Sequence, residues 1–183
     1  MVDYIQPISN CLAVRARVAL TLASAIRTLK VLQNVKTIHN AAKVALEDAW
    51  QWEIEQKISA SQLYQHIHPL LLYESELDKD SPQLSALFST ISAMYYTTWL
   101  ADGCERLLPN GKRPLLPNDI AEISEDSLSE SLAFATQAAK DKNSEIAWQL
   151  SAIEKLISNY KVNFPESLGV PISLQFFEDL KIN

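Results

Sequence analysis

The clearest alternation of apolar and polar positions along the chain lies in residues 37–57. On a helix of about 3.6 residues per turn, the apolar residues of this segment gather on one face and the charged residues on the other. The apolar face consists of Ile38, Ala41, Ala42, Ala45, Ala49 and Trp52, with Leu46 beside it. The outer face consists of Glu47, Gln51 and Glu55, with Trp50 on the flank between the two faces. Because alanines allow close packing, the pattern predicts a helix that contacts its neighbours through one alanine-rich face.

Residues 11–33 form a second apolar segment, which has no continuous polar face. Ser9 and Asn10 are good N-cap residues, so we expect a helix to begin there. A helix that is apolar on nearly every side is typical of a central helix surrounded by others. Its Arg15 and Arg27 would need partners if they are buried, and Glu53, on the apolar side of the next helix, is one candidate.

Start and stop signals divide the middle of the chain into further helices. The expected N-cap residues are Asn34 or Thr37 for the helix at 37–57, and Ser59 or Ser61 for a short helix after it. Pro69 should kink or end that short helix. Pro82, after Asp80 and Ser81, predicts the start of the longest helix, which should stop before the turn at residues 109–111.

The C-terminal part continues the same pattern after a proline-containing loop at residues 109–123. Residues 124–126 predict a new helix, and Asn143 and Ser144 are the expected caps of the next one. The expected core stripe of that helix is Ile146, Leu150, Ile153 and Ile157. Residues 173–182 predict a short terminal helix, with a strand at residues 170–174 as the alternative.

Together these segments predict an all-α bundle of about six or seven helices with several antiparallel pairs, in one domain covering residues 1–183. Only three glycines occur in the chain. Tight turns and phosphate-binding loops require glycine, so this scarcity argues against β-rich and nucleotide-binding folds.

The net charge of −6 disfavours nucleic acid as a partner, since phosphate binding needs clustered Lys and Arg. Acids are concentrated in residues 44–80, which carry eight acids against two bases. The apolar stretch at 12–32 contains four basic residues, which would be costly in a bilayer, so we expect no membrane association. No signal peptide pattern is visible, and Cys11 and Cys104 make no disulfide framework. The expected compartment is the cytoplasm.

No pattern in the chain predicts catalysis, a cofactor or a metal site. His66 and His68 are two residues apart, so on a helix they point to different sides, and no third ligand is spaced to join them. The acidic pairs lack the E-x-x-H spacing of bundle metal sites, and nucleophile elbows and Walker loops are absent. Trp50 and Tyr96 each sit beside a core residue and cannot share its direction, so either is a candidate exposed aromatic for a protein interface.

Five features follow one another within residues 10–160: a long Ala/Leu helix, A-L-E-D-A-W-Q-W, I-S-A-S-Q-L-Y, an acidic S-P helix start and N-D-I-A-E-I-S-E-D-S. This order of features resembles the all-helical immunity proteins of bacterial polymorphic toxin systems, or a related uncharacterised bacterial helical family. The resemblance implies a small cytoplasmic, non-enzymatic protein that binds and blocks one cognate toxin. An acidic member commonly faces a basic nuclease-type toxin, because complementary charge speeds association.

We therefore expect a protein partner with a basic domain to bind an acidic helical surface. The predicted contact residues are Glu47, Trp50, Gln51, Glu55, Glu74, Glu76 and Asp78. One alternative is a structural or regulatory homo-oligomer that uses apolar surface at residues 70–72 or 115–116. Another is an enzyme with a pocket assembled from His39, Tyr95 and Glu53, which would show perturbed titratable groups.

Overall fold

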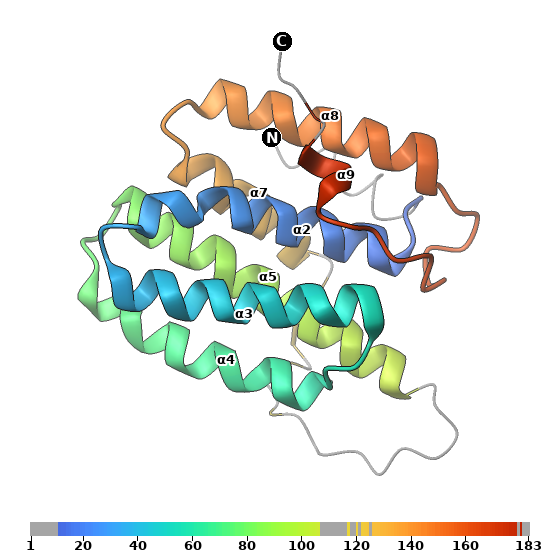
Figure 1. Ribbon diagram of the computed structural model, residues 1–183, viewed down its shortest axis with the longest axis horizontal. Helices are drawn as coiled ribbons and strands as arrows, with labels where there is room; N and C mark the ends of the chain where they lie inside the picture. The colour runs from blue at the N-terminus through green and yellow to red at the C-terminus, as the bar shows by residue number, and fades with distance from the viewer. Residues whose placement is uncertain are drawn as a thin grey trace.

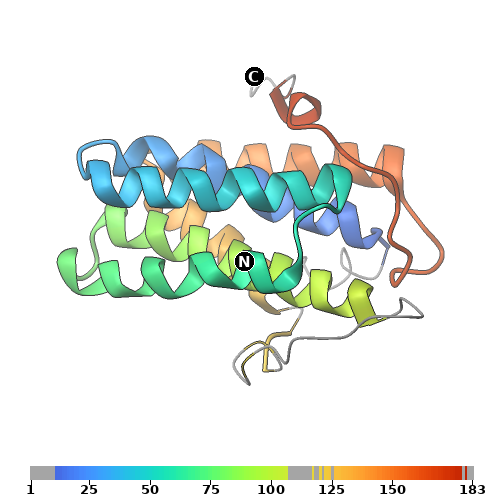
Figure 2. The ribbon, with the colours of Figure 1, turned by 60° about the horizontal axis from the view of Figure 1, so that its bottom comes forward.

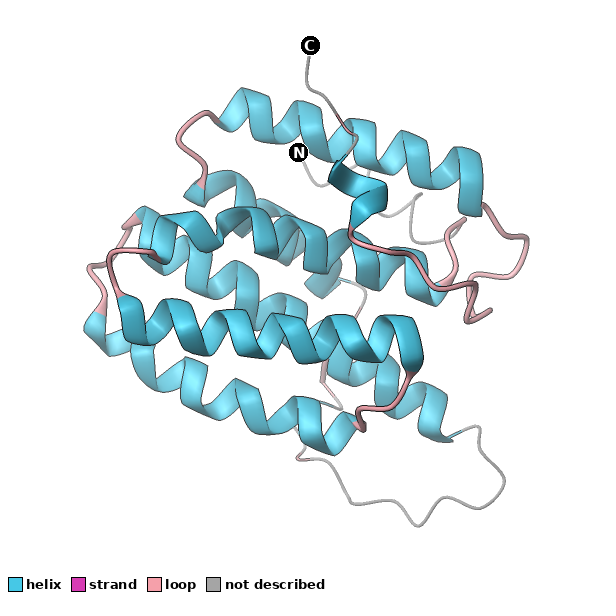
Figure 3. Cartoon of the chain, in the orientation of Figure 1, coloured by secondary structure: helices cyan, strands magenta, loops and turns pink. Residues whose placement is uncertain are grey.

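The computed structural model describes residues 11–106, 117, 120, 122–124, 126–178 and 180. These residues form seven α-helices and two short 3-10 helices and contain no β-strand, so the predicted all-α class is confirmed (Figure 3). In chain order the elements are α2 (Val14–Thr28), η1 (Leu29–Leu32), α3 (Lys36–Glu55), α4 (Ala60–Leu72), η2 (Tyr73–Glu76), α5 (Pro82–Arg106), α7 (Asp126–Ala138), α8 (Lys142–Tyr160) and α9 (Gln175–Glu178).

Helix α2 lies at the centre of the bundle, as its apolar sequence predicts. It packs against α3, α5, α7 and α8, and all of residues 14–25 are buried. Of these four helices, α3 packs on α5, α5 on α7 and α7 on α8, while α4 packs on the outer side of α3 and α5. Helices adjacent in the chain run antiparallel, which Figure 1 shows for α2 and α3. The predicted antiparallel pairs are therefore confirmed.

The ring of helices around α2 is incomplete between α3 and α8, which do not pack closely against each other in the described part of the chain. The segment that follows α8, residues 161–178, crosses this side of the bundle and ends in α9 (Figures 1 and 2). We call residues 161–178 the C-terminal strap. It supplies the cover that a further helix would otherwise provide.

The strap also determines where α2 begins. The first N–H groups of the helix, those of Val14 and Arg15, donate hydrogen bonds of 3.0 Å to the carbonyls of Ser167 and Leu168. Leu12 forms an isolated bridge with Lys161 instead of a helical turn. The predicted start near Ser9 and Asn10 is thus wrong for residues 11–13, and Ser9 and Asn10 themselves lie outside the described residues. Carbonyls distant in sequence satisfy the N-terminal donors here, where a side-chain cap was expected.

Three other predicted boundaries also differ from the structure. The N-cap residue of α3 is Val35, where Asn34 or Thr37 was predicted, and no side chain caps this helix. The predicted cap Ser59 is confirmed and forms a capping box with Gln62, but α4 continues through Pro69 to Leu72. Burial of Leu70 favours this last turn even though Pro69 cannot donate a backbone hydrogen bond. Asp141, accepting from the N–H groups of Asn143 and Ser144, caps α8.

The core face of α8 is rotated from the predicted stripe. Its buried residues are Glu145, Trp148, Gln149, Ala152, Ile153 and Leu156. Only Ile153 was predicted, and Leu150 is 40% exposed. The rotation follows from Trp148 and Glu145, which both contact Arg27 of α2. Side-chain partners on another helix, absent from the local pattern, decide which face turns inward.

The remaining helix predictions are confirmed in outline. Helix α5 begins at Pro82, with the Ser81 hydroxyl accepting from the N–H of Leu84, and is the longest described helix. Helix α7 begins at Asp126, whose N–H donates to the Ser124 hydroxyl. Residues 170–174 form no strand, and α9 follows them. Most of the predicted loop at 109–123, including its turn, lies outside the described residues.

Candidate functional site

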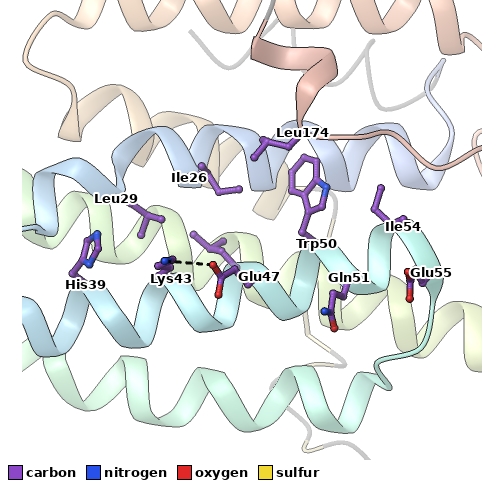
Figure 4. Close-up of a pocket in the computed structure, with 11 residues that line it drawn as sticks. Ile26, Leu29, His39, Lys43, Glu47, Trp50, Gln51, Ile54, Glu55 and Leu174 are labelled. Carbon is purple, nitrogen blue, oxygen red and sulfur yellow. Dashed lines mark ion pairs between the residues drawn. The ribbon is translucent and has the colours of Figure 1, made fainter.

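A groove of about 790 Å³ runs along the outer side of α3, between this helix and the end of α2 (Figure 4). Helix α3 provides most of its lining, η1 and α2 contribute one residue each, and the strap contributes one. The lining residues are Ile26, Leu29, His39, Lys43, Leu46, Glu47, Trp50, Gln51, Ile54, Glu55 and Leu174. The groove therefore lies on the side of the bundle where the ring of helices is incomplete.

The floor and inner wall of the groove are apolar. Leu46 is buried, whereas Ile26, Leu29, Trp50, Ile54 and Leu174 are only half-buried. In Figure 4 the indole of Trp50 lies beside Leu174, which descends from the strap. Half-buried apolar side chains that converge in this way make the groove a candidate interaction surface.

The outer rim of the groove is polar and carries two acids, Glu47 and Glu55, and one base, Lys43. Glu47, Gln51 and Glu55 follow one another at one-turn intervals along α3 and are exposed. Glu47 pairs with Lys43 at 3.7 Å, and Glu55 pairs with Lys57 at 2.7 Å. All four charged side chains are about half exposed or more, so these pairs contribute little to stability and leave the carboxylates accessible.

The structure brings together four of the seven predicted contact residues. Glu47, Trp50, Gln51 and Glu55 all line the groove. The other three predicted residues are elsewhere: Glu74 and Glu76 lie in η2 and Asp78 follows it, all three exposed but not lining the groove. The seven predicted contact residues thus belong to two separate segments, four in the groove along α3 and three in or just after η2.

Sequence reasoning missed Ile26, Leu29 and Leu174 as groove residues. Leu174 belongs to the strap, in which Phe177 packs edge-on against Trp50 at a centroid distance of 6.4 Å. Phe177 also contacts the Trp148 ring in a tilted arrangement at 6.1 Å. The Lys155 ammonium donates a 2.6 Å hydrogen bond to the carbonyl of Phe176. In the sequence only Phe176 and Phe177 indicated that residues 173–182 would pack on the bundle. These residues did not indicate which side of the bundle the segment would cover.

The buried carboxylate of Glu53 binds the backbone of the strap. Glu53 is fully buried and accepts hydrogen bonds from the backbone N–H of Ile172 at 3.0 and 3.3 Å. Burial raises the pKa of Glu53 from 4.5 to about 7, against the smaller opposing effects of the Ile172 N–H and the Arg15 charge. Glu53 thus interacts electrostatically with one of the two arginines for which it was a candidate partner.

The other arginine, Arg27, has a different partner. Its Nε and Nη2 donate to Oε2 of Glu145 at 3.1 and 3.0 Å, and its guanidinium lies 4.2 Å from the ring centroid of Trp148. Glu145 is buried. The prediction that Glu53 pairs with Arg27 is therefore wrong, and Arg27 instead links α2 to α8.

The other predicted candidates are dispersed. His66 lies 2.7 Å from Asp48 at the α3–α4 contact, and His68 is exposed. Tyr96, a candidate exposed aromatic, is fully buried because α5 is enclosed by α2, α4 and α7. Of the alternative pocket residues, His39 lines the groove, whereas Tyr95 and Glu53 do not. No cluster of three His, Cys, Asp or Glu that could hold a metal occurs among the described residues.

Two further expectations concern apolar surface. Leu70 is buried and Leu72 is 62% exposed, so the expected apolar patch at residues 70–72 is narrower than its sequence implies. Leu115 and Leu116 lie outside the described residues. None of the helices in the described part of the chain has the length and apolar character needed to cross a bilayer.

Comparison with known proteins identifies one family. The family described as Immunity protein Imm6 has a model that matches residues 16–141. No curated protein and no solved structure matches the chain. The matched segment contains every groove residue except Leu174, and it confirms the resemblance to immunity proteins of toxin systems.

Proposed function

The chain belongs to the immunity protein Imm6 family, and we propose that it protects the cell by binding one cognate toxin and blocking it without chemistry of its own. The family match over residues 16–141 is the observation that carries this proposal. The partner is a protein, and the encounter takes place in the cytoplasm, where an internalised or newly made toxin would act.

The groove along α3 is the proposed binding surface. It combines half-buried apolar side chains on the inside with a charged, exposed rim, which is the usual organisation of a protein interface. Trp50 is its largest aromatic residue, and aromatic anchors carry much of the binding free energy in such interfaces. Glu47, Gln51 and Glu55 supply the polar rim.

Charge supports a basic toxin domain as the partner. The chain carries a net charge of −6, and the rim of the groove carries Glu47 and Glu55. A basic toxin surface would be steered towards these acids, and wrong acidic partners would be repelled. The exposed acids Glu74, Glu76 and Asp78 form a second acidic surface, which we propose contributes to this long-range attraction.

The direct test uses the toxin domain encoded beside the gene for this protein. Co-expression should restore growth to cells that produce the toxin, and calorimetry should show a one-to-one complex. A toxin domain from an unrelated system serves as the control. If the two proteins neither bind nor restore growth, the proposed function is wrong.

The acidic rim can be tested separately by association kinetics. Replacing both Glu47 and Glu55 with alanine should slow association about threefold to tenfold at low salt and weaken its salt dependence. Glu130→Ala, which removes an exposed acid on α7, is the matched control. If the double variant associates with the toxin as fast as the unchanged protein, Glu47 and Glu55 do not contribute to association.

A further inference from the structure

The groove occupies a position that a helix would fill in a complete ring. Around α2 the packing passes from α3 through α5 and α7 to α8, and among the described residues the strap lies between α8 and α3. The strap follows the N-terminal part of α2, where Arg17 donates to the Pro165 carbonyl and Ile172 is fully buried. Beyond Leu174 it turns towards α8, and Ile26 and Leu29 remain beside the open groove.

We propose that this groove receives a helix of the toxin, apolar on the face that enters the groove and bearing Lys or Arg along the edge that meets α3. This inference rests on the proposed function and names the kind of segment that the toxin contributes. The helix would complete the ring around α2.

The dimensions of the groove fit a helix. Its lining extends from His39 to Glu55 along α3, and the sixteen residue-to-residue steps between them span about 24 Å. Leu46, Trp50 and Ile54 repeat at one-turn intervals along this length. A docked amphipathic helix presents side chains at the same intervals, and two antiparallel helices such as α2 and α3 offer it a groove.

The rim determines the charge of the incoming helix. Glu47, Gln51 and Glu55 also repeat every turn, so they run parallel to the apolar row on its solvent side. Their present partners, Lys43 and Lys57, are exposed, so a Lys or Arg from another molecule can replace them at little cost. A second copy of this chain is disfavoured, because a symmetric contact would place Glu47 and Glu55 against the same acids of the other copy.

The test compares two substitutions on the same helix. Ile54→Glu places a charge in the groove, whereas Val44→Glu changes a β-branched residue that is 49% exposed and does not line the groove. Ile54→Glu should weaken toxin binding about tenfold to a hundredfold, as expected for an anchor in a hydrophobic groove. Val44→Glu should leave the affinity within about twofold. Circular dichroism should show that both variants keep their helices.

A second measurement does not depend on the stability of the variants. A photoreactive benzoylphenylalanine at the exposed position Gln51 should crosslink to the toxin, at a helix that carries Lys or Arg beside an apolar face. Crosslinking to a second copy, to a non-helical toxin segment, or to nothing in a complex that forms would overturn the inference. A tightly retained small apolar molecule that Ile54→Glu releases would also overturn it.

The two proposals fail in different ways. If the unchanged protein binds and neutralises the toxin while Ile54→Glu binds as tightly as Val44→Glu, the groove is not the site and only this inference is lost. If the unchanged protein does not bind the toxin at all, both the proposed function and this inference are wrong.

Discussion

Replacement of Glu53 by glutamine should make the protein more stable at neutral and alkaline pH. The Glu53 carboxylate is fully buried and accepts hydrogen bonds from the Ile172 N–H, and the facing charge is that of Arg15. Burial raises its pKa from 4.5 to about 7, although Ile172 and Arg15 both act in the opposite direction. A glutamine keeps an acceptor for the Ile172 N–H but cannot ionise.

The size and sign of the effect follow from this pKa. Between pH 4.5 and 7 the unfolded chain releases the proton of Glu53 while the folded protein retains it, so the folded state loses stability as the pH rises. The loss approaches about 3 kcal/mol above pH 7, because each pH unit across this interval contributes about 1.4 kcal/mol. Glu53→Gln removes this loss of stability. The variant should therefore be more stable than the unchanged protein at high pH and equally stable near pH 4.

Urea unfolding of both proteins at intervals from pH 4 to pH 8 measures this difference. Glu55→Gln, an exposed position two residues further along α3, controls for the loss of one negative charge. A stability difference that stays constant across the pH range would refute the reasoning. So would a difference that favours the unchanged protein at high pH, because it would mean that Arg15 outweighs the cost of burial.

Three further substitutions test the contacts that hold the strap and the helices, each by thermal or urea unfolding. Gly169→Ala should cost about 1–3 kcal/mol, since φ is +77° and the new Cβ would lie 2.5 Å from Cβ of Ala13; an unchanged midpoint would contradict this close approach. Arg27→Ala should cost about 2 kcal/mol by leaving Glu145 unpaired, and the cost should shrink when Glu145→Gln is added. Ser59→Ala should cost about 1 kcal/mol through loss of the α4 capping box, whereas Ser61→Ala should change stability by less than about 0.5 kcal/mol.

The packing face of α3 shows what could be predicted from the sequence. Ile38, Ala42, Ala45, Ala49 and Trp52 are buried as expected. Their spacing is a local property of one helix, so it can be recognised without knowing which neighbours the helix contacts. The start of α5 at Pro82 and the outward direction of Glu47 are also local properties, and the sequence predicted both correctly.

Faces of uniformly apolar helices could not be predicted in this way. Helix α5 is apolar on several sides, so its sequence does not distinguish buried Tyr96 from half-buried Tyr95. In α8 the contact between Arg27 and Glu145 decides the inward face, and these residues lie far apart in the chain. The start of α2 could not be predicted either, because the carbonyls that accept from its first N–H groups belong to the strap, far away in the chain.

The candidate site was predicted only where it belongs to one helix. Glu47, Trp50, Gln51 and Glu55 share one side of α3, and the sequence pattern placed them together. Ile26, Leu29 and Leu174 come from three other segments and meet this helix only in the folded bundle. The apolar wall opposite α3 is therefore a tertiary feature, and the sequence pattern indicated only Trp50 and the polar rim on α3 itself.

Hydrogen–deuterium exchange of the protein with and without its cognate toxin domain tests the central claim most directly. We expect toxin binding to slow exchange in α3 from Lys43 to the end of the helix, in η1 and in the strap around Leu174, and to leave exchange in α7 unchanged. Slowed exchange confined to α5 and α7, or none in a complex that forms, would contradict the account.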